Sequence, residues 1–411
     1  MPLPLPAPCP EGSADPAARL NTARAILGFS YEQTRELPGA AWQAGFRVDF
    51  EGQEGLDDGG LTKAWVAEVG FALWGDSELF DSYAAGNFFK PDEVETLSID
   101  GVPTASVELY RWVGRFAAYA LYQRCVLDCR LCPWVFRSLQ RSAAPRNFFH
   151  PKSAAPDWPA TPEGEDAMLA DLACLDHTLA SNLWRVRHEM SEEELHWLDF
   201  TYAGAELEPG GAKRQVTAET KPAYVRLACA GLLRQRSGLG LQVFAEGFFE
   251  VIPERLLEGV PEDGILRLLA GEGEVNEAQL DELERTVIPA GLVPASLRDH
   301  PRVREAAAWL FRAARAGDGD FRARLLEFWL GVSRVPLMGL GALLPRPKLQ
   351  IMVQPDSRGG VRRIASWPRE RLPEGHTCGN ELWVALQDSY EQVAKQLQLA
   401  VQNFESGFSL R

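Results

Sequence analysis

Apolar residues recur at helical spacing along most of this chain, and this periodicity restricts the possible folds more than any other feature of the sequence. Residues three and four positions apart share one face of a helix, and an apolar face must be buried against another element. The spacing predicts helices over 61–73, 107–121, 303–310 and 390–404, and another around 325–329.

Strand-like pieces are shorter and more scattered. They lie at 46–50, 198–202, 349–353 and 361–367, so the chain is expected to be a mixed α+β protein. With 411 residues, 46% of them hydrophobic, the chain has enough apolar surface for more than one core. Its length suggests two or three domains.

Proline and glycine mark where regular structure is expected to stop. Residues 1–45 are rich in Pro, Ala and Gly and show little periodicity, which predicts a disordered lead-in with order beginning near Phe46. Five prolines between 142 and 166 predict a long surface loop. A charged connection containing a proline, at 297–301, separates two apolar-periodic stretches and is expected to be a domain boundary.

The charge balance argues against two classes of partner. Lys and Arg number 42 against 57 Asp and Glu, which gives a formal net charge of −15. Nucleic acids and anionic membranes are held mostly by basic side chains, so neither is expected as the main partner. No apolar stretch approaches the roughly 20 residues that span a bilayer, and the start of the chain lacks the features of a secretory signal.

The cysteines and histidines do not predict a metal or a cofactor. Seven cysteines in a chain without a secretory signal are expected to be reduced thiols, which favours a cytoplasmic or nuclear location. Cys125, Cys129 and Cys132 have the spacing of one helical face, but zinc would need a fourth ligand, so buried thiols are preferred. The histidines lack metal-site spacing, and the glycines at 51–60 form no phosphate-binding motif.

The segment L-P-E-G-H-T-C-G-N-E-L, residues 372–382, carries the side chains that nucleophilic chemistry needs. Cys378 lies in a segment bounded by glycine and proline, and His376 could favour its thiolate because residues i and i+2 share a face of an extended chain. An ordinary thiol has a pKa of about 8.5, so a few per cent is thiolate at neutral pH. That fraction suffices to attack an activated acyl group such as a thioester, whereas attack on an amide would need a dedicated base.

This string resembles the motif around the acceptor cysteine of the HECT ubiquitin-protein ligases, L-P-x-(A/S)-H-T-C-x-N-x-L, and matches it in register. Further blocks that resemble the family follow in its order, and the resemblance covers roughly 46–411. These blocks are F-R-V-D-F-E-G-Q-E-G-L-D-D-G-G-L-T-K-A-W (46–65), Y-R-W-V-G-R-F-A-A-Y-A-L-Y (110–122), V-T-A-E-T-K-P-A-Y-V (216–225), A-E-G-F-F-E-V-I-P (245–253) and L-L-E-F-W-L-G-V-S-R-V-P (325–336).

The resemblance implies a ubiquitin-protein ligase that needs no cofactor. Cys378 would accept ubiquitin from a charged ubiquitin-conjugating enzyme as a thioester and pass it to a lysine of a substrate protein. A catalytically weak HECT-like scaffold that only binds the conjugating enzyme is the alternative. A Cys-His hydrolase is less favoured, because it needs a distant histidine oriented by Asn or Asp and the sequence carries no thiol-protease signature.

The resemblance also implies a bilobal fold. A larger, mostly helical N-lobe with short sheets would span 46–297 and contain an inserted smaller subdomain, at about 180–250, that binds the conjugating enzyme. Residues 298–302 would form a hinge, and a compact α/β C-lobe would span 303–411. Rotation about the hinge would bring the acceptor cysteine first to the conjugating enzyme and then to the lysine.

Further site residues are implied by their position in the family motifs. His376, Thr377 and Asn380 would support the nucleophile. Phe408 would orient the lobes for transfer, with an ordinary contact at the end of a helix as the alternative. Four residues fall in the part that forms the conjugating-enzyme groove, with plain core packing as an equal alternative: Leu183, Phe200, Leu241 and Phe244.

The sequence departs from the family near the cysteine. Gly375 replaces alanine or serine and Gly379 replaces phenylalanine, and both are expected to loosen the loop. This loosening is the one feature that favours the scaffold alternative. Trp383 stands where some members place an acidic residue, so the group that deprotonates the acceptor lysine is not assigned.

Overall fold

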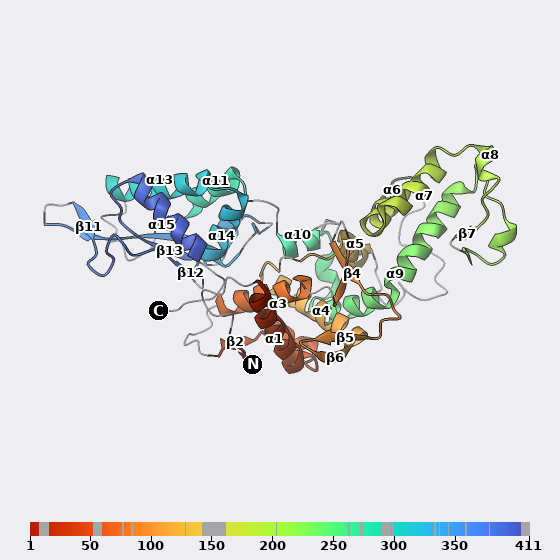
Figure 1. Ribbon diagram of the computed structural model, residues 1–411, viewed down its shortest axis with the longest axis horizontal. Coiled ribbons are helices and arrows are strands. Elements are labelled where there is room, and N and C mark those ends of the chain that lie inside the picture. The colour runs from red at the N-terminus through yellow and green to blue at the C-terminus, as the bar shows by residue number, and fades with distance from the viewer. Residues whose placement is uncertain are drawn as a thin grey trace.

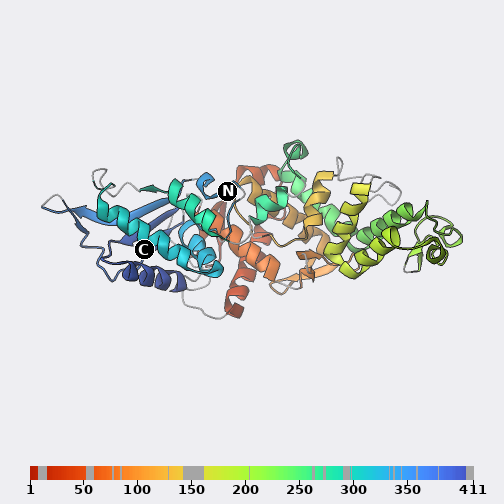
Figure 2. The same cartoon turned by 90° about the horizontal axis from the view of Figure 1, so that it is seen from above.

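The computed structural model shows an elongated molecule with the final third of the chain at one end (Figures 1 and 2). Its described residues are 1–7, 16–51, 60–75, 78–83, 86–127, 129–141, 162–202, 204–261, 264–271, 275–289, Leu297, 299–332, 334–336, 338–343, 345–357, 360–377 and 379–403. In this part of the chain, no helix is both long and apolar enough to cross a membrane.

Helices dominate the described residues, and the strands are mostly short. The helices are α1 (Pro16–Thr34), α2 (Gly39–Ala44), α3 (Gly60–Gly75), α4 (Ser106–Tyr122), α5 (Pro133–Arg141), α6 (Pro162–Leu175), α7 (His177–His188), α8 (Glu192–Leu195), α9 (Lys221–Val251), α10 (Gly264–Ala270), α11 (Glu277–Thr286), α13 (Pro301–Ala316), α14 (Gly319–Leu330) and α15 (Tyr390–Asn403), with 3-10 turns η1 (Gly211–Lys213), η2 (Glu254–Leu257) and η3 (Leu340–Ala342). The strands are β1 (Pro2–Leu5), β2 (Arg47–Phe50), β3 (Phe80–Tyr83), β4 (Gly86–Phe89), β5 (Thr96–Ile99), β6 (Val102–Ala105), β7 (Thr201–Tyr202), β8 (Ala205–Glu206), β9 (Ile288–Pro289), β10 (Lys348–Pro355), β11 (Val361–Arg363), β12 (Glu374–His376) and β13 (Glu381–Ala385).

The mixed α+β class is confirmed, and so are the predicted helices at 61–73, 107–121 and 303–310, which are parts of α3, α4 and α13. The helix predicted at 390–404 is confirmed as α15 up to Asn403, and residue 404 lies outside the described residues. The helical spacing of Cys125, Cys129 and Cys132 is misleading, because α4 ends at Tyr122. All three are nevertheless buried free thiols, as expected for small apolar side chains.

Two predictions about irregular segments need correction. Residues 1–45 are not a disordered lead-in where the structure describes them, since β1 pairs in parallel with β2 and α1 and α2 follow. Leu3 and Leu5 are buried and alternate with prolines, which an edge strand tolerates. The predicted loop at 142–166 ends early, because α6 begins at Pro162, where a missing N–H costs nothing. Residues 142–161 lie outside the described residues.

Aromatic side chains join the first helices into one core. Trp65 on α3 packs edge-on against Phe116 on α4, with ring centroids 5.3 Å apart. The indole of Trp65 also donates a 2.8 Å hydrogen bond to the Ser30 hydroxyl of α1, which satisfies a polar atom that burial would otherwise penalise. This first hydrophobic cluster draws all of its buried residues from positions 3–270.

The crossing of α4 and α9 brings two backbones into contact. A Cβ on Gly114 would lie 2.0 Å from the carbonyl oxygen of Phe244, and one on Gly247 would lie 1.9 Å from that of Arg111. Neither distance can be accommodated by a side-chain shift, because the opposing atoms belong to the main chain. Glycine at both positions is therefore a requirement of this crossing.

A second hydrophobic cluster holds the end of the chain. Its sheet has the strand order β11-β10-β13-β12, with β9 also paired to β10, and α13, α14 and α15 pack with it. All of its buried residues lie at 275–401, so the cluster includes α11. The guanidinium of Arg315 on α13 bonds the carboxylates of Asp281 and Glu284 on α11. The predicted boundary at 297–301 therefore falls within this cluster and not between the two clusters.

The helix crossing gives a matched pair of stability tests. Gly114→Ala should lower the free energy of unfolding by about 1–3 kcal/mol, because the added methyl group forces the two backbones apart. Gly231→Ala, on an exposed position of α9 with nothing within 4 Å, should instead raise it by about 0.5–1 kcal/mol through helix propensity. Urea unfolding of both variants measures the difference, and equal effects would contradict the close crossing.

Candidate active site

The predicted acceptor segment forms a tight turn between two paired strands. β12 runs antiparallel to β13, with Gly375 opposite Leu382, and β13 runs parallel to the long strand β10. Residues 377–380 connect the two strands and are called the cysteine loop below. Cys378 itself lies outside the described residues, so the site is defined by the residues on either side of it.

Asn380 fixes the backbone of the cysteine loop. It is fully buried and has a φ of 52°, a left-handed conformation that asparagine tolerates better than most residues. Its N–H donates to the carbonyl oxygen of Thr377 at 3.2 Å. Its own carbonyl oxygen accepts from the N–H of Lys348 at 2.8 Å and from the indole of Trp329 at 3.1 Å.

The side chain of Asn380 is also held from two directions. The amide Nδ2 donates to the carbonyl oxygen of Pro345, which precedes β10. The amide Oδ1 accepts a 3.0 Å hydrogen bond from Nζ of Lys63, which lies on α3 in the first part of the chain. Asn380 is therefore a structural anchor of the loop, which fits the supporting role predicted for it without testing that role.

Thr377 and His376 present unpartnered polar atoms beside the cysteine position. The hydroxyl of Thr377, a residue only 4% exposed, and Nε2 of His376 make no hydrogen bond to any residue that the structure describes. Buried polar groups normally find a partner, and those that do not often belong to functional sites. A bound protein or an ordered water could use either atom.

The imidazole of His376 packs against one aromatic ring. Its ring centroid is 4.2 Å from that of Trp383, and its Nε2 is 3.9 Å from a carboxylate oxygen of Glu374. Burial holds the pKa of the imidazole below 6.5, although the charges of Glu374 and Glu381 act in the opposite direction. The neutral imidazole is therefore favoured near neutral pH.

The glycine in β12 does not loosen the site, and that expectation was wrong for Gly375. A Cβ at Gly375 would lie 1.9 Å from the carbonyl oxygen of Phe328, so glycine lets β12 pack directly on the end of α14. At Gly379 an added Cβ would meet only the flexible side chain of Glu381, 3.0 Å away. The substitution at 375 thus tightens the support of the loop.

Glu381 is an acidic group of the site that the sequence pattern did not indicate. Burial acts to raise the pKa of this carboxyl, but hydrogen bonds from Lys348 and Trp383 outweigh it and hold the pKa below its usual range. Glu381 is therefore a carboxylate. Its position three residues after Cys378 in the sequence was visible, but its partners come from β10 and β13 and could not be read from spacing.

The four residues expected to line the conjugating-enzyme groove are core residues. Each is at most 2% exposed, and this burial contradicts direct contact with a partner in this arrangement: Leu183, Phe200, Leu241 and Phe244. The ring of Phe244 packs 5.6 Å from that of Phe89, and the guanidinium of Arg214 covers the ring of Phe200. Their apolar character reflected packing, which sequence position alone cannot separate from binding.

The same segment does expose aromatic side chains that the sequence analysis did not single out. Trp197, just after α8, is 86% exposed, and Trp184 on α7 is 44% exposed. α8 begins at a capping box in which Ser191 and Glu194 bond each other's backbone N–H groups. Exposed tryptophan is costly in water and is typical of protein interfaces.

Two of the other thiols that the structure describes are poor nucleophiles. Burial raises the pKa of both Cys132 and Cys229 to about 12, so neither forms thiolate at neutral pH. Within the described residues, no three His, Cys, Asp or Glu side chains lie close enough to hold a metal ion. Phe408 lies outside the described residues, so its predicted role stays a prediction.

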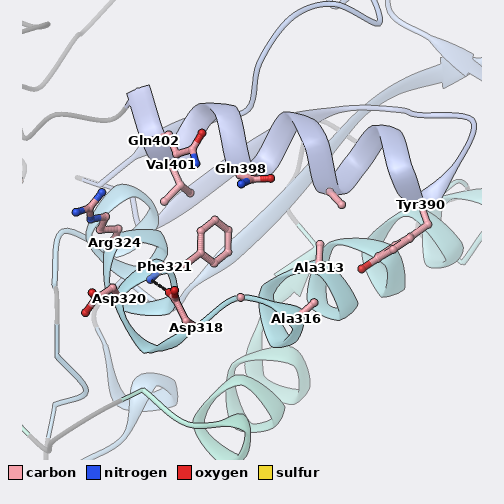
Figure 3. A pocket seen from close by; sticks show the side chains of 12 residues that line it. Ala313, Ala316, Asp318, Asp320, Phe321, Arg324, Tyr390, Gln398, Val401 and Gln402 are labelled. Carbon is pink, nitrogen blue, oxygen red and sulfur yellow. Dashed lines mark hydrogen bonds between the residues drawn. The ribbon is translucent and has the colours of Figure 1, made fainter.

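A pocket of about 530 Å³ lies between α13, α14 and α15 (Figure 3). The carboxylate of Asp318 in its wall accepts a hydrogen bond from the N–H of Phe321 at 2.8 Å and thereby caps α14. None of the residues lining the pocket belongs to the cysteine loop or its supports. The pocket is therefore separate from the candidate active site.

The lowered pKa of His376 predicts a pH dependence of stability. Because the unfolded chain binds a proton more readily than the folded one, the free energy of unfolding should fall as pH drops through 6.5 and stop falling below the folded-state pKa. His376→Gln should remove this part of the dependence. Urea unfolding between about pH 8 and about pH 5 checks it, and an unchanged profile in the variant would refute the assignment.

Comparison with known proteins identifies the family. The model of the HECT-domain (ubiquitin-transferase) family matches residues 72–411. The E3 ubiquitin-protein ligase UPL1 of Arabidopsis thaliana is 26% identical over 406 residues, covering 95% of this chain and 10% of the relative. HUWE1 of Mus musculus is 27% identical over 371 residues, covering 88% and 7%, and NEDD4 of Homo sapiens is 25% identical over 392 residues, covering 92% and 26%.

The chain thus spans about a quarter or less of each of these three ubiquitin-protein ligases. The matched range contains the cysteine loop and both strands that hold it. The chain belongs to the HECT-domain (ubiquitin-transferase) family.

Proposed function

We propose that this chain is a ubiquitin-protein ligase in which Cys378 carries ubiquitin as a thioester. The observation that supports this most directly is that the family match covers 72–411 and includes the string H-T-C-G-N. The buried contacts of Asn380 on one side and Gly375 on the other give the loop a fixed frame. A nucleophile on a supported turn needs little rearrangement before it reacts.

The proposed reaction has two acyl transfers. In loading, the Cys378 sulfur attacks the thioester carbonyl of the charged conjugating enzyme, and the electron pair of the broken C–S bond leaves on the conjugating enzyme's sulfur. In discharge, an uncharged lysine nitrogen attacks the new thioester and forms an amide. The Cys378 sulfur then leaves with the electron pair, and the extra proton of the nitrogen passes to a base.

His376 is suited to receive that proton. Its imidazole is favoured in the neutral form, and its Nε2 has no hydrogen-bond partner among the described residues. Glu381 is less suited, because its hydrogen bonds to Lys348 and Trp383 stabilise the carboxylate and make it a weak base. Glu381 would instead help to hold the loop and the Trp383 ring beside His376.

A bilobal arrangement is part of the proposal. The two hydrophobic clusters give each lobe its own core, as relative rotation requires. Because α11 and α13 share the second cluster, the packing favours a division at 271–275 over the predicted hinge at 298–302. The free thiols among the described residues support a cytoplasmic or nuclear location.

The conjugating enzyme is proposed to dock on the exposed tryptophans of the α7–α8 segment. Trp197 and Trp184 provide apolar contact area there, and three adjacent acidic side chains, Glu192, Glu193 and Glu194, would favour a partner with a basic surface. Leu183 and Phe200 are buried next to Trp184 and three positions after Trp197 in the sequence, and would support this surface from the core. Their proposed role is thus to shape the docking surface.

Replacing Trp197 tests the docking surface. Trp197→Ala should weaken binding of the conjugating enzyme by about 2 kcal/mol or more, roughly thirtyfold, because exposed aromatic anchors dominate such interfaces. Leu256→Ala is the matched control, since Leu256 is 58% exposed on η2 and outside the proposed surface. Binding to an uncharged conjugating enzyme is measured by titration calorimetry, and equal affinities for both variants would contradict this placement.

Replacing the nucleophile tests the reaction itself. Incubation of the chain with a charged conjugating enzyme should give a ubiquitin adduct that thiol reductants cleave. Cys378→Ser should abolish that adduct or convert it into a reductant-resistant ester, because an oxygen ester does not exchange with thiols. Cys229→Ser, at a buried thiol, is the control and should load normally.

The scaffold alternative makes the opposite prediction. A chain that binds the conjugating enzyme but never forms the reductant-sensitive adduct would favour it. The one feature that favoured it was a loop loosened by Gly375 and Gly379. The tight packing at Gly375 removes the first of these two observations.

A further inference from the structure

One hydrogen bond joins the first hydrophobic cluster to the cysteine loop. Lys63 lies on α3 between Thr62 and Ala64, and its Nζ donates to Oδ1 of Asn380 at 3.0 Å across 317 positions of the sequence. Leu61 and Ala64 are buried in the first cluster, whereas Leu382 of β13 is buried in the second. The Lys63 side chain therefore reaches from one core to the loop of the other.

The acceptor end of this bond is rigid. The N–H, the carbonyl oxygen and Nδ2 of Asn380 all bond groups at 329–377, on the second cluster's side of the contact. Its Oδ1 is satisfied from α3 instead. Because Asn380 is fully buried, loss of the lysine would leave an amide oxygen short of a donor in a place that water does not reach easily.

The stem of Lys63 packs at the same junction. Gly331, the left-handed residue that ends α14, has a φ of 69°, and a Cβ built on it would lie 3.4 Å from Cβ of Thr377 and 3.8 Å from Cδ of Lys63. The lysine stem and the threonine before Cys378 therefore both lie near Gly331 at the end of α14. The ammonium group of Lys63 thus bonds the cysteine loop at Asn380, and the methylene groups of its stem lie close to the loop.

This junction lies far from the proposed docking surface. In both views the α8 segment is at one end of the long axis, and the sheet of β10 and β13 is toward the other, with α3 between them (Figures 1 and 2). The proposed docking surface and the contact of the loop with α3 therefore lie at different places along the long axis. With the conjugating enzyme docked on that surface, loading would take place with the loop away from Lys63.

We propose that Lys63 is a positioning residue for the discharge step. Resting on the proposed function, this inference states that the loaded cysteine loop returns to α3 and is held there by the Lys63–Asn380 hydrogen bond while a substrate lysine attacks. The bond fixes the orientation of the thioester through Asn380 and takes no part in bond making. Loading, which occurs with this contact open, does not depend on it.

Single-turnover kinetics separate the two steps. Loading is followed as transfer of ubiquitin from a charged conjugating enzyme to the chain, and discharge as loss of the purified thioester to free lysine. Lys63→Met should load within about twofold of the unaltered chain but discharge about tenfold more slowly, the effect of losing one hydrogen bond to a buried acceptor. Lys63→Arg keeps a donor and a long stem and should restore most of the discharge rate.

Two further lysines supply controls. Lys395→Met changes an exposed residue of α15 and should alter neither step. Lys348→Met removes an ion pair to Glu381 on the strand that follows the same loop, but this pair lies within the second cluster, with Nζ 2.7 Å from the carboxylate. Any effect of this variant should fall on loading and discharge alike.

The outcomes are distinct. A Lys63→Met chain that slows both steps equally, or neither, would overturn the inference, as would a discharge-specific defect in Lys348→Met. Failure of Lys63→Arg to recover discharge would also count against it, because a donor at that position would then not be what matters. If the unaltered chain forms no reductant-sensitive adduct, the proposed function itself fails, and the inference fails with it.

Discussion

The close crossing of α4 and α9 is the constraint on which the first hydrophobic cluster depends. Gly114 and Gly247 each face a main-chain oxygen of the opposite helix at a distance that excludes any side chain. α9 has 31 residues and is therefore roughly 45 Å long, so it extends from this crossing to α6 and α7. The position of the exposed Trp197 segment relative to the core is consequently set by how tightly the two helices meet.

The cysteine loop is held differently, by polar contacts to Asn380 in place of apolar packing. The left-handed backbone of this residue would be strained in an isolated strand, and the surrounding hydrogen bonds stabilise it. Glycine at 375 lets β12 pack directly on the end of α14, and glycine at 331 adopts the left-handed φ of 69° that ends this helix beside the loop. Such a site is precise because few alternative arrangements satisfy all of these buried groups.

Sequence reasoning succeeded where the information was local. The helices α4 and α15 follow from apolar spacing within one element, and the cysteine motif is a short contiguous string. It failed for residues 1–45 because the leucines of β1 become a strand only when β2 pairs with them. It also misjudged Gly375. Glycine is required at this position because a carbonyl oxygen of α14, 47 positions earlier in the sequence, leaves no space for a side chain.

The amino-acid sequence by itself determined the α+β class and the family, because these depend on composition, period and an ordered set of motifs. It also predicts Cys378 as the residue that carries an acyl group. Tertiary structure alone decided which apolar side chains are core and which are surface, as Phe200 and Trp197 show three positions apart. It also decided that Lys63 meets Asn380. Contacts between distant segments depend on how whole helices and sheets pack, and no local pattern encodes that geometry.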